Sequence, residues 1–153
     1  MRALENNPPL RFERKLNEMV KFLLDTDTCI YIIKKRPEWL FSRFQSFRPG
    51  EIGISTITLA ELRFGIAKSQ FPEKNNFALE TTLRPIEVLP FDENAAFVYG
   101  EIRSILEKAG TPIGSMDCLI AAHSLSIDAT IVTNNEREFC RVPSLKIQNW
   151  EKK

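Results

Sequence analysis

Four acidic residues in this sequence stand where apolar stretches end or begin, and they are its best candidates for chemistry. Asp25 directly follows the apolar run FLL, and Glu61 lies in the segment after the run IGIS. Asp117 precedes the apolar segment CLIAAH, and Glu138 lies shortly after the run TIV. Carboxylates placed in this way can bind a divalent cation or support hydrolysis as acid and base.

Each acid also has a simple structural explanation. The helix dipole favours an acid in a first helical turn by about 0.3–1 kcal/mol. Thr58 and Glu61 have the spacing of a capping box, and Asp25 or Asp27 could cap a helix over residues 29–34. Four acids at one edge are harder to explain in this way, because like charges repel and raise one another's pKa. A divalent cation would remove that cost, and oxygen ligands without His or Cys select Mg²⁺ or Mn²⁺.

The composition excludes several other kinds of chemistry. The 153 residues carry 21 Lys and Arg against 20 Asp and Glu, which suits one domain and argues against a polybasic nucleic-acid binder. The single histidine, His123, excludes nucleases that use two histidines and H-E-x-x-H metalloproteases. Three widely separated cysteines without a C-x-x-C pair predict neither a zinc cluster nor a disulfide framework. Carboxylates are therefore the remaining chemical resource.

The elements that must position the acids follow from the alternation of short apolar stretches with stretches of helical spacing. This alternation predicts an α/β fold with a central, mostly parallel sheet and helices on both faces. The predicted strands are residues 21–24, 51–54, 86–89, 130–132 and 146–148. Ligands bind such sheets beyond the carboxyl ends of the strands, so we expect all four acids at one edge.

Helix positions are indicated by apolar spacing and by helix-breaking residues. Pro37 and Pro72 are expected in first helical turns, and Gly110 after the end of a helix. The clearest stripe of helical spacing consists of Phe97, Ile102, Ile105 and Leu106.

Residues 1–18 differ from the rest of the chain. They contain the helix-breaking cluster NNPP and a charged stretch without clean periodicity, whereas Met19 begins the first apolar strand. We expect residues 1–18 to be a flexible extension or a misread start, and residues 19–151 to form the domain. No apolar run has the roughly 18 residues of a membrane span and no secretory signal is present, so we expect a cytoplasmic protein.

The acids lie within four motifs that resemble a known family. The segments LLDTDTCI (residues 23–30) and ITLAELRFG (57–65) resemble the opening motifs of the VapC-type toxins of the PIN-domain family. The match continues with PIGSMDCLIAAH (112–123) and IVTNNEREFCRVP (131–143). The resemblance covers residues 19–151 in order, and four matching motifs make it highly specific.

The resemblance implies a PIN-like three-layer fold and a Mg²⁺-dependent endoribonuclease that could also use Mn²⁺. It implies the toxin of a type II toxin–antitoxin pair, which inhibits translation by cutting RNA, often tRNA. It further implies inhibition by a small VapB-like antitoxin and toxin homodimers within the complex.

The resemblance also assigns site residues. The family's invariant acids correspond to Asp25, Glu61 and Asp117. Asp25 and Asp117 would be direct metal ligands, and Glu61 would complete the ligand set directly or through water. One departure is Asp27, because the family commonly has Asn there. The extra charge could tighten metal binding or strain the metal-free site.

A fourth polar position lies in the segment after residue 132. Either Asn135 or Glu138 could be its functional member, and the sequence leaves this choice open. Thr133 would help to orient water or a second ion through its hydroxyl group.

Other residues near these motifs have weaker functional assignments. Arg63, Lys68 and Arg137 are candidates for contacts with RNA phosphates, although a solvated helix face is the simpler explanation for most basic residues. His123 lies six positions after Asp117, so the two do not closely share a helix face, and we expect His123 to be a packing residue.

Aromatic residues recur every three positions at Phe41, Phe44 and Phe47, close to Trp39. This stripe could belong to the core or form an apolar groove for a dimer or an antitoxin helix. The sequence does not separate these alternatives.

Two other functions compete with that of a metal-dependent endoribonuclease. Asp25 and Asp27 have the spacing used by haloacid-dehalogenase phosphatases, but that motif needs Thr or Val where this chain has Cys29, and its downstream lysine and paired aspartates have no counterpart. The non-enzymatic alternative is a catalytically silent PIN-like module that binds RNA or a partner. Loss of an invariant acid would favour that module, and all three acids are present.

Overall fold

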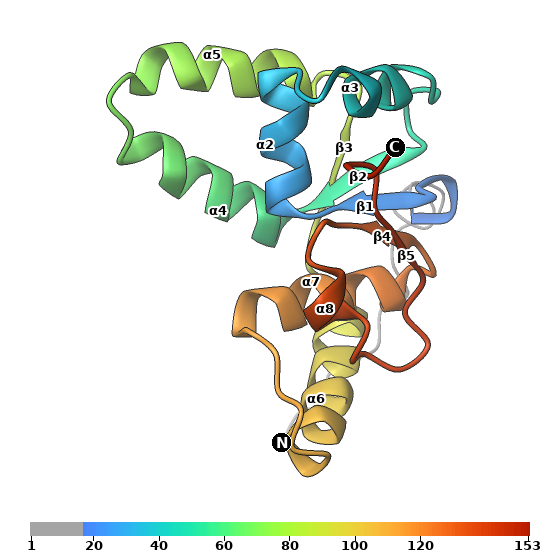
Figure 1. The fold of residues 1–153 in the computed structure, drawn as a ribbon. Coiled ribbons are helices and arrows are strands. Elements are labelled where there is room, and N and C mark those ends of the chain that lie inside the picture. Colours follow the sequence, from blue (N-terminus) through green and yellow to red (C-terminus); the bar gives the residue numbers. More distant parts are fainter. Residues whose placement is uncertain (1–16) are drawn as a thin grey trace.

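A five-stranded sheet forms the centre of the computed structural model, which describes residues 17–153 (Figure 1). All strands run parallel, in the order β3-β2-β1-β4-β5. Their bounds are Phe22–Leu24 for β1, Ile52–Ser55 for β2, Glu87–Leu89 for β3, Thr130–Val132 for β4 and Ile147–Gln148 for β5. The predicted parallel sheet is confirmed, with every strand end within one residue of its expected position. The prediction for residues 1–18 lies outside the described residues, except for the last two.

The direction of strand addition reverses at β1. The chain adds β2 and β3 on one side of β1, and β4 and β5 on the other. The Asp25 backbone N–H, at the end of β1, donates to the carbonyl of Val132 at 3.0 Å. The carboxyl ends of β1 and β4, where the strand order reverses, are therefore the place where such a sheet binds a ligand.

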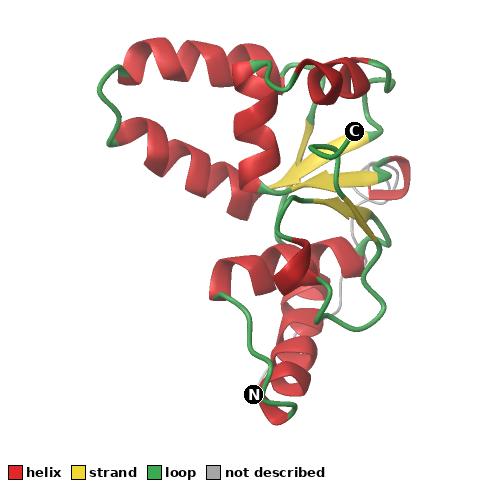
Figure 2. Ribbon diagram, in the orientation of Figure 1, coloured by secondary structure: helices red, strands yellow, loops and turns green. Residues whose placement is uncertain are grey.

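Helices cover both faces of the sheet and complete three layers (Figure 2). On one side lie α2 (Thr26–Lys34), α3 (Glu38–Gln45), α4 (Thr56–Ala67) and α5 (Pro72–Leu83). On the other side lie α6 (Glu93–Lys108), α7 (Ser115–Ser126) and the short α8 (Glu136–Phe139). None of the helices in this described part of the chain is long and apolar enough to span a membrane.

The sheet separates two apolar cores, because successive residues of a strand point to opposite faces. Leu23 is buried in the core that contains residues of α6 and α7. Its neighbour Leu24 is buried in the core formed with α2, α3 and α5. The central strand is thus fully covered, as its continuous apolar sequence predicts.

Polar residues at two strand ends begin the helices that follow. The Asp25 side chain caps α2 by accepting the backbone N–H of Thr28 at 2.9 Å. The Ser55 side chain caps α4 by accepting the backbone N–H of Ile57 at 3.1 Å. Both caps satisfy amides that the first helical turn leaves without partners, and both fix a helix directly beyond the carboxyl edge.

The structure corrects several predicted helix details. The capping box at Thr58 and Glu61 is wrong, because α4 already begins after Ser55 and Thr58 lies inside the helix. The helix expected over residues 29–34 begins earlier, because Asp25 caps it. Pro37 is the N-cap of α3 and not part of its first turn.

Two other predicted helix boundaries are confirmed. Pro72 occupies the first position of α5. Gly110 follows the end of α6 with φ +69°, a left-handed backbone conformation that glycine adopts readily.

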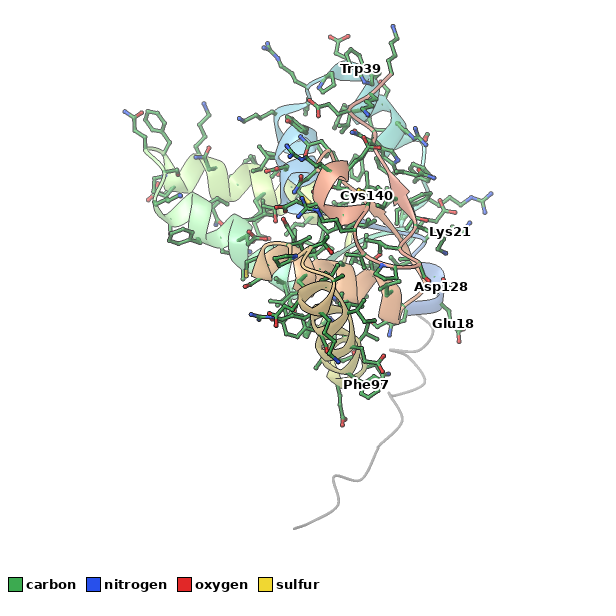
Figure 3. All side chains as sticks on the ribbon, turned by 60° about the horizontal axis from the view of Figure 1, so that its bottom comes forward. Glu18, Lys21, Trp39, Phe97, Asp128 and Cys140 are labelled. Atoms are coloured by element: carbon green, nitrogen blue, oxygen red, sulfur yellow. The ribbon has the colours of Figure 1, made fainter. Side chains whose placement is uncertain are left out.

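The stripe predicted on α6 is buried at only two of its four positions. Ile102 and Leu106 lie in the core, whereas Phe97 is 68% exposed and Ile105 is 49% exposed. Figure 3 shows Phe97 on the outer side of α6. α6 packs mainly on α7, and this contact covers only part of the apolar face of α6. The apolar residues outside the contact therefore stay in solvent.

Candidate active site

Asp25 lies buried at the carboxyl end of β1, next to the end of β4, with 5% of its surface exposed. Its Oδ1 accepts the Thr28 amide, and its Oδ2 accepts the hydroxyl group of Thr133, the residue that follows β4. Burial raises the pKa of Asp25, whereas the hydrogen bonds from Thr133 and Thr28 act in the opposite direction. The structure thus brings together two predicted site residues from distant parts of the chain.

Asp117, Asn135 and Glu138 meet where the first turn of α7 faces α8. The Asn135 Nδ2 donates to Glu138 Oε2 at 3.0 Å and lies 3.4 Å from Asp117 Oδ2. The Asn135 backbone N–H donates to Thr133 Oγ1 at 2.9 Å, which connects this group to Asp25. Both candidates for the fourth polar position therefore lie at the same place, so the geometry does not choose between them.

Glu61 reaches the site from α4. Its Oε1 accepts the hydroxyl group of Thr26 at 2.8 Å. Thr26 is the first residue of α2 and directly follows Asp25. Thr26 was not predicted as a site residue, and only its place between Asp25 and Asp27 could have indicated it.

The four carboxylates, Asp25, Glu61, Asp117 and Glu138, form what we call the acidic rim. Their proximity is seen in Asp117, whose pKa is raised to about 7. Burial is the largest cause, followed by a hydrogen bond with Glu138 and by the negative charges of Glu138, Asp25 and Glu61.

The carboxyl groups of Asp117 and Glu138 shift each other's pKa in opposite directions. A hydrogen bond between two carboxyl groups requires a proton on one of them. The pKa of Glu138 is lowered, first by its hydrogen bond with Asp117 and then by the bond from Asn135, which is opposite in direction to the shift at Asp117.

The donor chemistry of the acidic rim fits a hard divalent cation. Its ligand atoms are all carboxylate oxygens, which Mg²⁺ and Mn²⁺ prefer, and a cation would relieve the repulsion that raises the Asp117 pKa. Within residues 17–153, however, no group of three or more His, Cys, Asp or Glu side chains stands close enough to hold a metal ion. The acids thus share one edge without forming a closed ligand set.

The three residues expected to contact RNA differ in their contacts within the protein and in their distance from the acidic rim. Arg63 is engaged within the protein, because its guanidinium group donates to Asn76 and Glu80 of α5. The Lys68 ammonium group lies 4.8 Å from the centroid of the Phe64 ring. Arg137 is exposed on α8, next to Glu138. Of these three, only Arg137 stands both exposed and adjacent to the acidic rim.

His123 is a buried residue, as expected, with 1% of its surface exposed. Burial lowers its pKa to about 4, so the imidazole is neutral at physiological pH. Its Nδ1 lies 2.7 Å from Ser55 Oγ. This partner was not predicted, because the two residues stand 68 positions apart.

The aromatic stripe of Phe41, Phe44 and Phe47, which runs from α3 into the turn after it, belongs partly to the core and partly to a groove. Phe44 is buried, whereas Phe41 and Phe47 are half-buried and line a cavity of about 470 Å³ together with Lys35 and Arg48. A second cavity, of about 320 Å³, lies between α2 and α4 beside Thr26 and Glu61. Core packing and an apolar groove, the two alternatives that the sequence left open for the aromatic stripe, are thus both found in the structure.

Comparison with known proteins identifies the family. The model of the PIN domain matches residues 22–145, which is most of the chain. The chain belongs to the PIN-domain family. The Salmonella typhimurium protein named tRNA(fMet)-specific endonuclease VapC is 45% identical to this PIN domain over 132 residues, covering 86% of this chain and 99% of that protein. Ribonuclease VapC2 of Rickettsia felis is 41% identical, covering 86% of this chain and 98% of that protein.

Solved structures agree with this assignment. The crystal structure of DNA-bound VapBC from Salmonella typhimurium has a chain with a TM-score of 0.82 and 45% identity to this PIN domain. It covers 86% of this chain and 99% of that chain. VapBC2 from Rickettsia felis, bound to a DNA fragment from its promoter, has a chain with a TM-score of 0.80 and 38% identity, with the same coverage. The expected three-layer PIN fold is thereby confirmed.

Proposed function

We propose that this protein is a metal-dependent endoribonuclease, the toxin of a VapBC-type toxin–antitoxin pair that inhibits translation by cutting RNA. The observation that carries the proposal is the acidic rim, where acids from four segments of the chain face the carboxyl edge of the sheet and the charges of three of them act on Asp117. The names of the relatives support ribonuclease activity, and one of them names tRNA(fMet) as its substrate. We therefore propose tRNA as the substrate class and residues 19–151 as the catalytic domain.

Asp25 and Asp117 would hold Mg²⁺, with Glu61 contributing directly or through water. When bound, the ion would make a water molecule more acidic and hold the charge that develops on the phosphate. Thr133 keeps the Asp25 carboxylate oriented through its hydroxyl group. Asn135 orients the Glu138 carboxylate and contacts Asp117, so this pair can position the attacking water.

Hydrolysis adds water across one P–O bond of the RNA backbone. We propose in-line attack at phosphorus with cleavage of the P–O3′ bond, which leaves a 5′-phosphate and a 3′-hydroxyl group. A mechanism that uses two histidines and the ribose 2′-hydroxyl is not available, because the one histidine is buried against Ser55. The exposed Arg137 is positioned to contact an RNA phosphate near the acidic rim.

A VapB-like antitoxin is the proposed partner, because similar structures are complexes named VapBC. We further propose that the toxin forms homodimers within that complex. The cavity between α2 and α4 opens beside Glu61, so a partner bound there would lie next to the acidic rim.

Cleavage of a labelled tRNA pool tests the activity. We expect Mg²⁺-dependent products from the wild type and at least about 10³-fold less product from Asp25→Asn, because that change removes the charge from a proposed metal ligand. End analysis of the fragments should show 5′-phosphates. Identical products from wild type and variant would contradict the proposed activity.

Thermal unfolding tests the metal site separately. Millimolar Mg²⁺ or Mn²⁺ should raise the Tm of the wild type, by an amount equivalent to about 1.4 kcal/mol at ten times the Kd, because the ion binds only the folded state. Asp117→Asn should lose most of this increase. An equal increase in the variant would place the metal elsewhere.

A further inference from the structure

A buried polar contact connects the helix that carries Glu61 to the helix that carries Asp117. His123 of α7 and Ser55 at the start of α4 are 1% and 0% exposed, and their Nδ1 and Oγ atoms lie 2.7 Å apart. Ser55 is also the N-cap of α4, since its Oγ accepts the backbone N–H of Ile57 at 3.1 Å. One hydroxyl group therefore fixes the first turn of α4 and attaches it to α7.

The loop between β3 and α6 also contacts His123 and the start of α4. The Phe91 ring meets the His123 imidazole edge-on, with centroids 5.6 Å apart and planes at 87°. The Phe91 backbone N–H donates to Oγ1 of Thr56, the first residue of α4, at 3.1 Å. The first turn of α4 is thus fixed through both Ser55 and Thr56.

We infer that His123 is a positioning residue, which sets the start of α4 against α7 and so holds Glu61 and Asp117 at their working separation. This inference rests on the proposed function, because it assumes that the acidic rim binds the metal ion. Glu61 lies less than two helical turns beyond Ser55, so a tilt of α4 at its cap displaces the carboxylate. Asp117 lies on the same helix as His123.

The chemistry of the contact argues against packing as the whole role of His123. A buried imidazole costs free energy unless it is hydrogen-bonded, and an apolar side chain would fill the same space without that cost. The neutral ring can donate or accept at Nδ1, and the Ser55 hydroxyl group can take the complementary role while accepting the Ile57 amide. The contact therefore fixes both the distance and the direction between the two helices.

Variants at both ends of the contact test this role. His123→Leu removes the hydrogen bond and keeps an apolar side chain, whereas His123→Asn keeps a group that can donate or accept towards Ser55. Ser55→Ala removes the same bond from the other side, and also the cap. Leu106→Ala is the matched control, because Leu106 is buried on α6 and has no part in the acidic rim.

Three measurements on folded protein separate positioning from stability: Mn²⁺ affinity, kcat and KM on tRNA, and hydrogen exchange at the Ile57 amide. We expect His123→Leu and Ser55→Ala to lower Mn²⁺ affinity and kcat by about 10–100-fold with little change in KM. Their Ile57 amides should exchange faster without metal. His123→Asn should restore most of the affinity and kcat, and Leu106→Ala should lower only the Tm.

Two results would overturn the inference in distinguishable ways. If His123→Leu lowers the Tm but leaves Mn²⁺ affinity and kcat at the wild-type level, His123 only packs and the proposed function stands. If the wild type neither binds Mn²⁺ nor cleaves tRNA, the proposed function fails and the inference fails with it.

Discussion

The acidic rim and the aromatic cluster of Phe22, Phe47 and Trp150 lie in different parts of this molecule and differ in how they satisfy their polar groups. At the rim, burial first, and then the hydrogen bond with Glu138 and the neighbouring negative charges, raise the pKa of Asp117 to about 7. In the aromatic cluster, Trp150 is buried and stacks on Phe47, with centroids 5.1 Å apart and planes at 7°.

The polar groups of the aromatic cluster all have partners. Trp150 Nε1 donates to Gln148 Oε1 at 3.0 Å, and the same oxygen accepts Arg43 Nη2 at 3.2 Å. The Arg43 guanidinium group also lies 5.3 Å from the Trp150 ring centroid. This region therefore combines apolar burial with satisfied hydrogen bonds, as a stabilising core does.

The difference between the two regions indicates what each contributes. Buried like charges oppose folding, so the acidic rim is an arrangement that stability alone does not favour. Perturbed carboxylates in a crevice are typical of functional sites. The aromatic cluster supplies part of the stability that allows the rim to persist.

The largest effect on stability is expected in the aromatic cluster. Trp150→Ala should lower the free energy of unfolding by about 3 kcal/mol, because it leaves a cavity among Phe22 and Phe47. Urea denaturation measures this loss. Cleavage of tRNA by the folded variant should persist. A variant as stable as the wild type would contradict the conclusion that the aromatic cluster stabilises the protein.

A smaller effect on the free energy of unfolding is expected at the acidic rim, where removing a charge should stabilise the protein and not destabilise it. The pKa of Asp117 is about 7 in the folded state against 3.8 for an ordinary Asp, so between these values the folded state binds more protons than the unfolded state. Without divalent ions, stability should therefore fall as pH rises from about 4 to about 7. Asp117 is half-buried and partly screened, so we expect a loss of about 1–2 kcal/mol.

Asp117→Asn sharpens this prediction. At pH 8 the variant should be more stable than the wild type by the same amount, and the difference should vanish near pH 4. Urea denaturation in EDTA across this pH range measures both. Parallel pH curves for the two proteins would show that the repulsion at the rim does not affect stability.

The smallest effect is expected at the opposite end of β1 from Asp25. Lys21 Nζ pairs with Glu51 Oε1 at 3.1 Å, but the Lys21 side chain is 66% exposed. Exposed pairs contribute little, because solvent screens them and both side chains lose freedom. Lys21→Met should therefore unfold at the same urea concentration as the wild type. A clear shift would show that this pair does more than a surface pair normally does.

Much of the sheet was predictable because its strands are local features of the sequence. Each strand is a short apolar run between breakers, and burial on both faces makes such runs continuous. The exposed face of α6 was not predictable in this way. Phe97 and Ile105 have helical spacing, but only the extent of the contact with α7 decides which apolar positions are buried.

The acids of the candidate site were also accessible from the sequence, because strand ends of a parallel sheet lie at a common edge. The partners of these acids were not. Thr26 supports Glu61 through a side-chain hydrogen bond across two helices, and such a contact leaves no periodic signal. The groove beside Phe41 and Phe47 likewise depends on how α3 packs against α5.

The alternation of strands and helices, and the placement of Asp25, Glu61 and Asp117 beside apolar runs, can be read from the sequence because both follow from local apolar patterning. That Asn135 lies between Asp117 and Glu138, and that His123 contacts Ser55, follows only from how the helices pack on the sheet. These contacts join helices and loops whose mutual orientation is fixed by packing on the sheet. Distances within a few tenths of an ångström, which govern hydrogen bonding, arise only at that level.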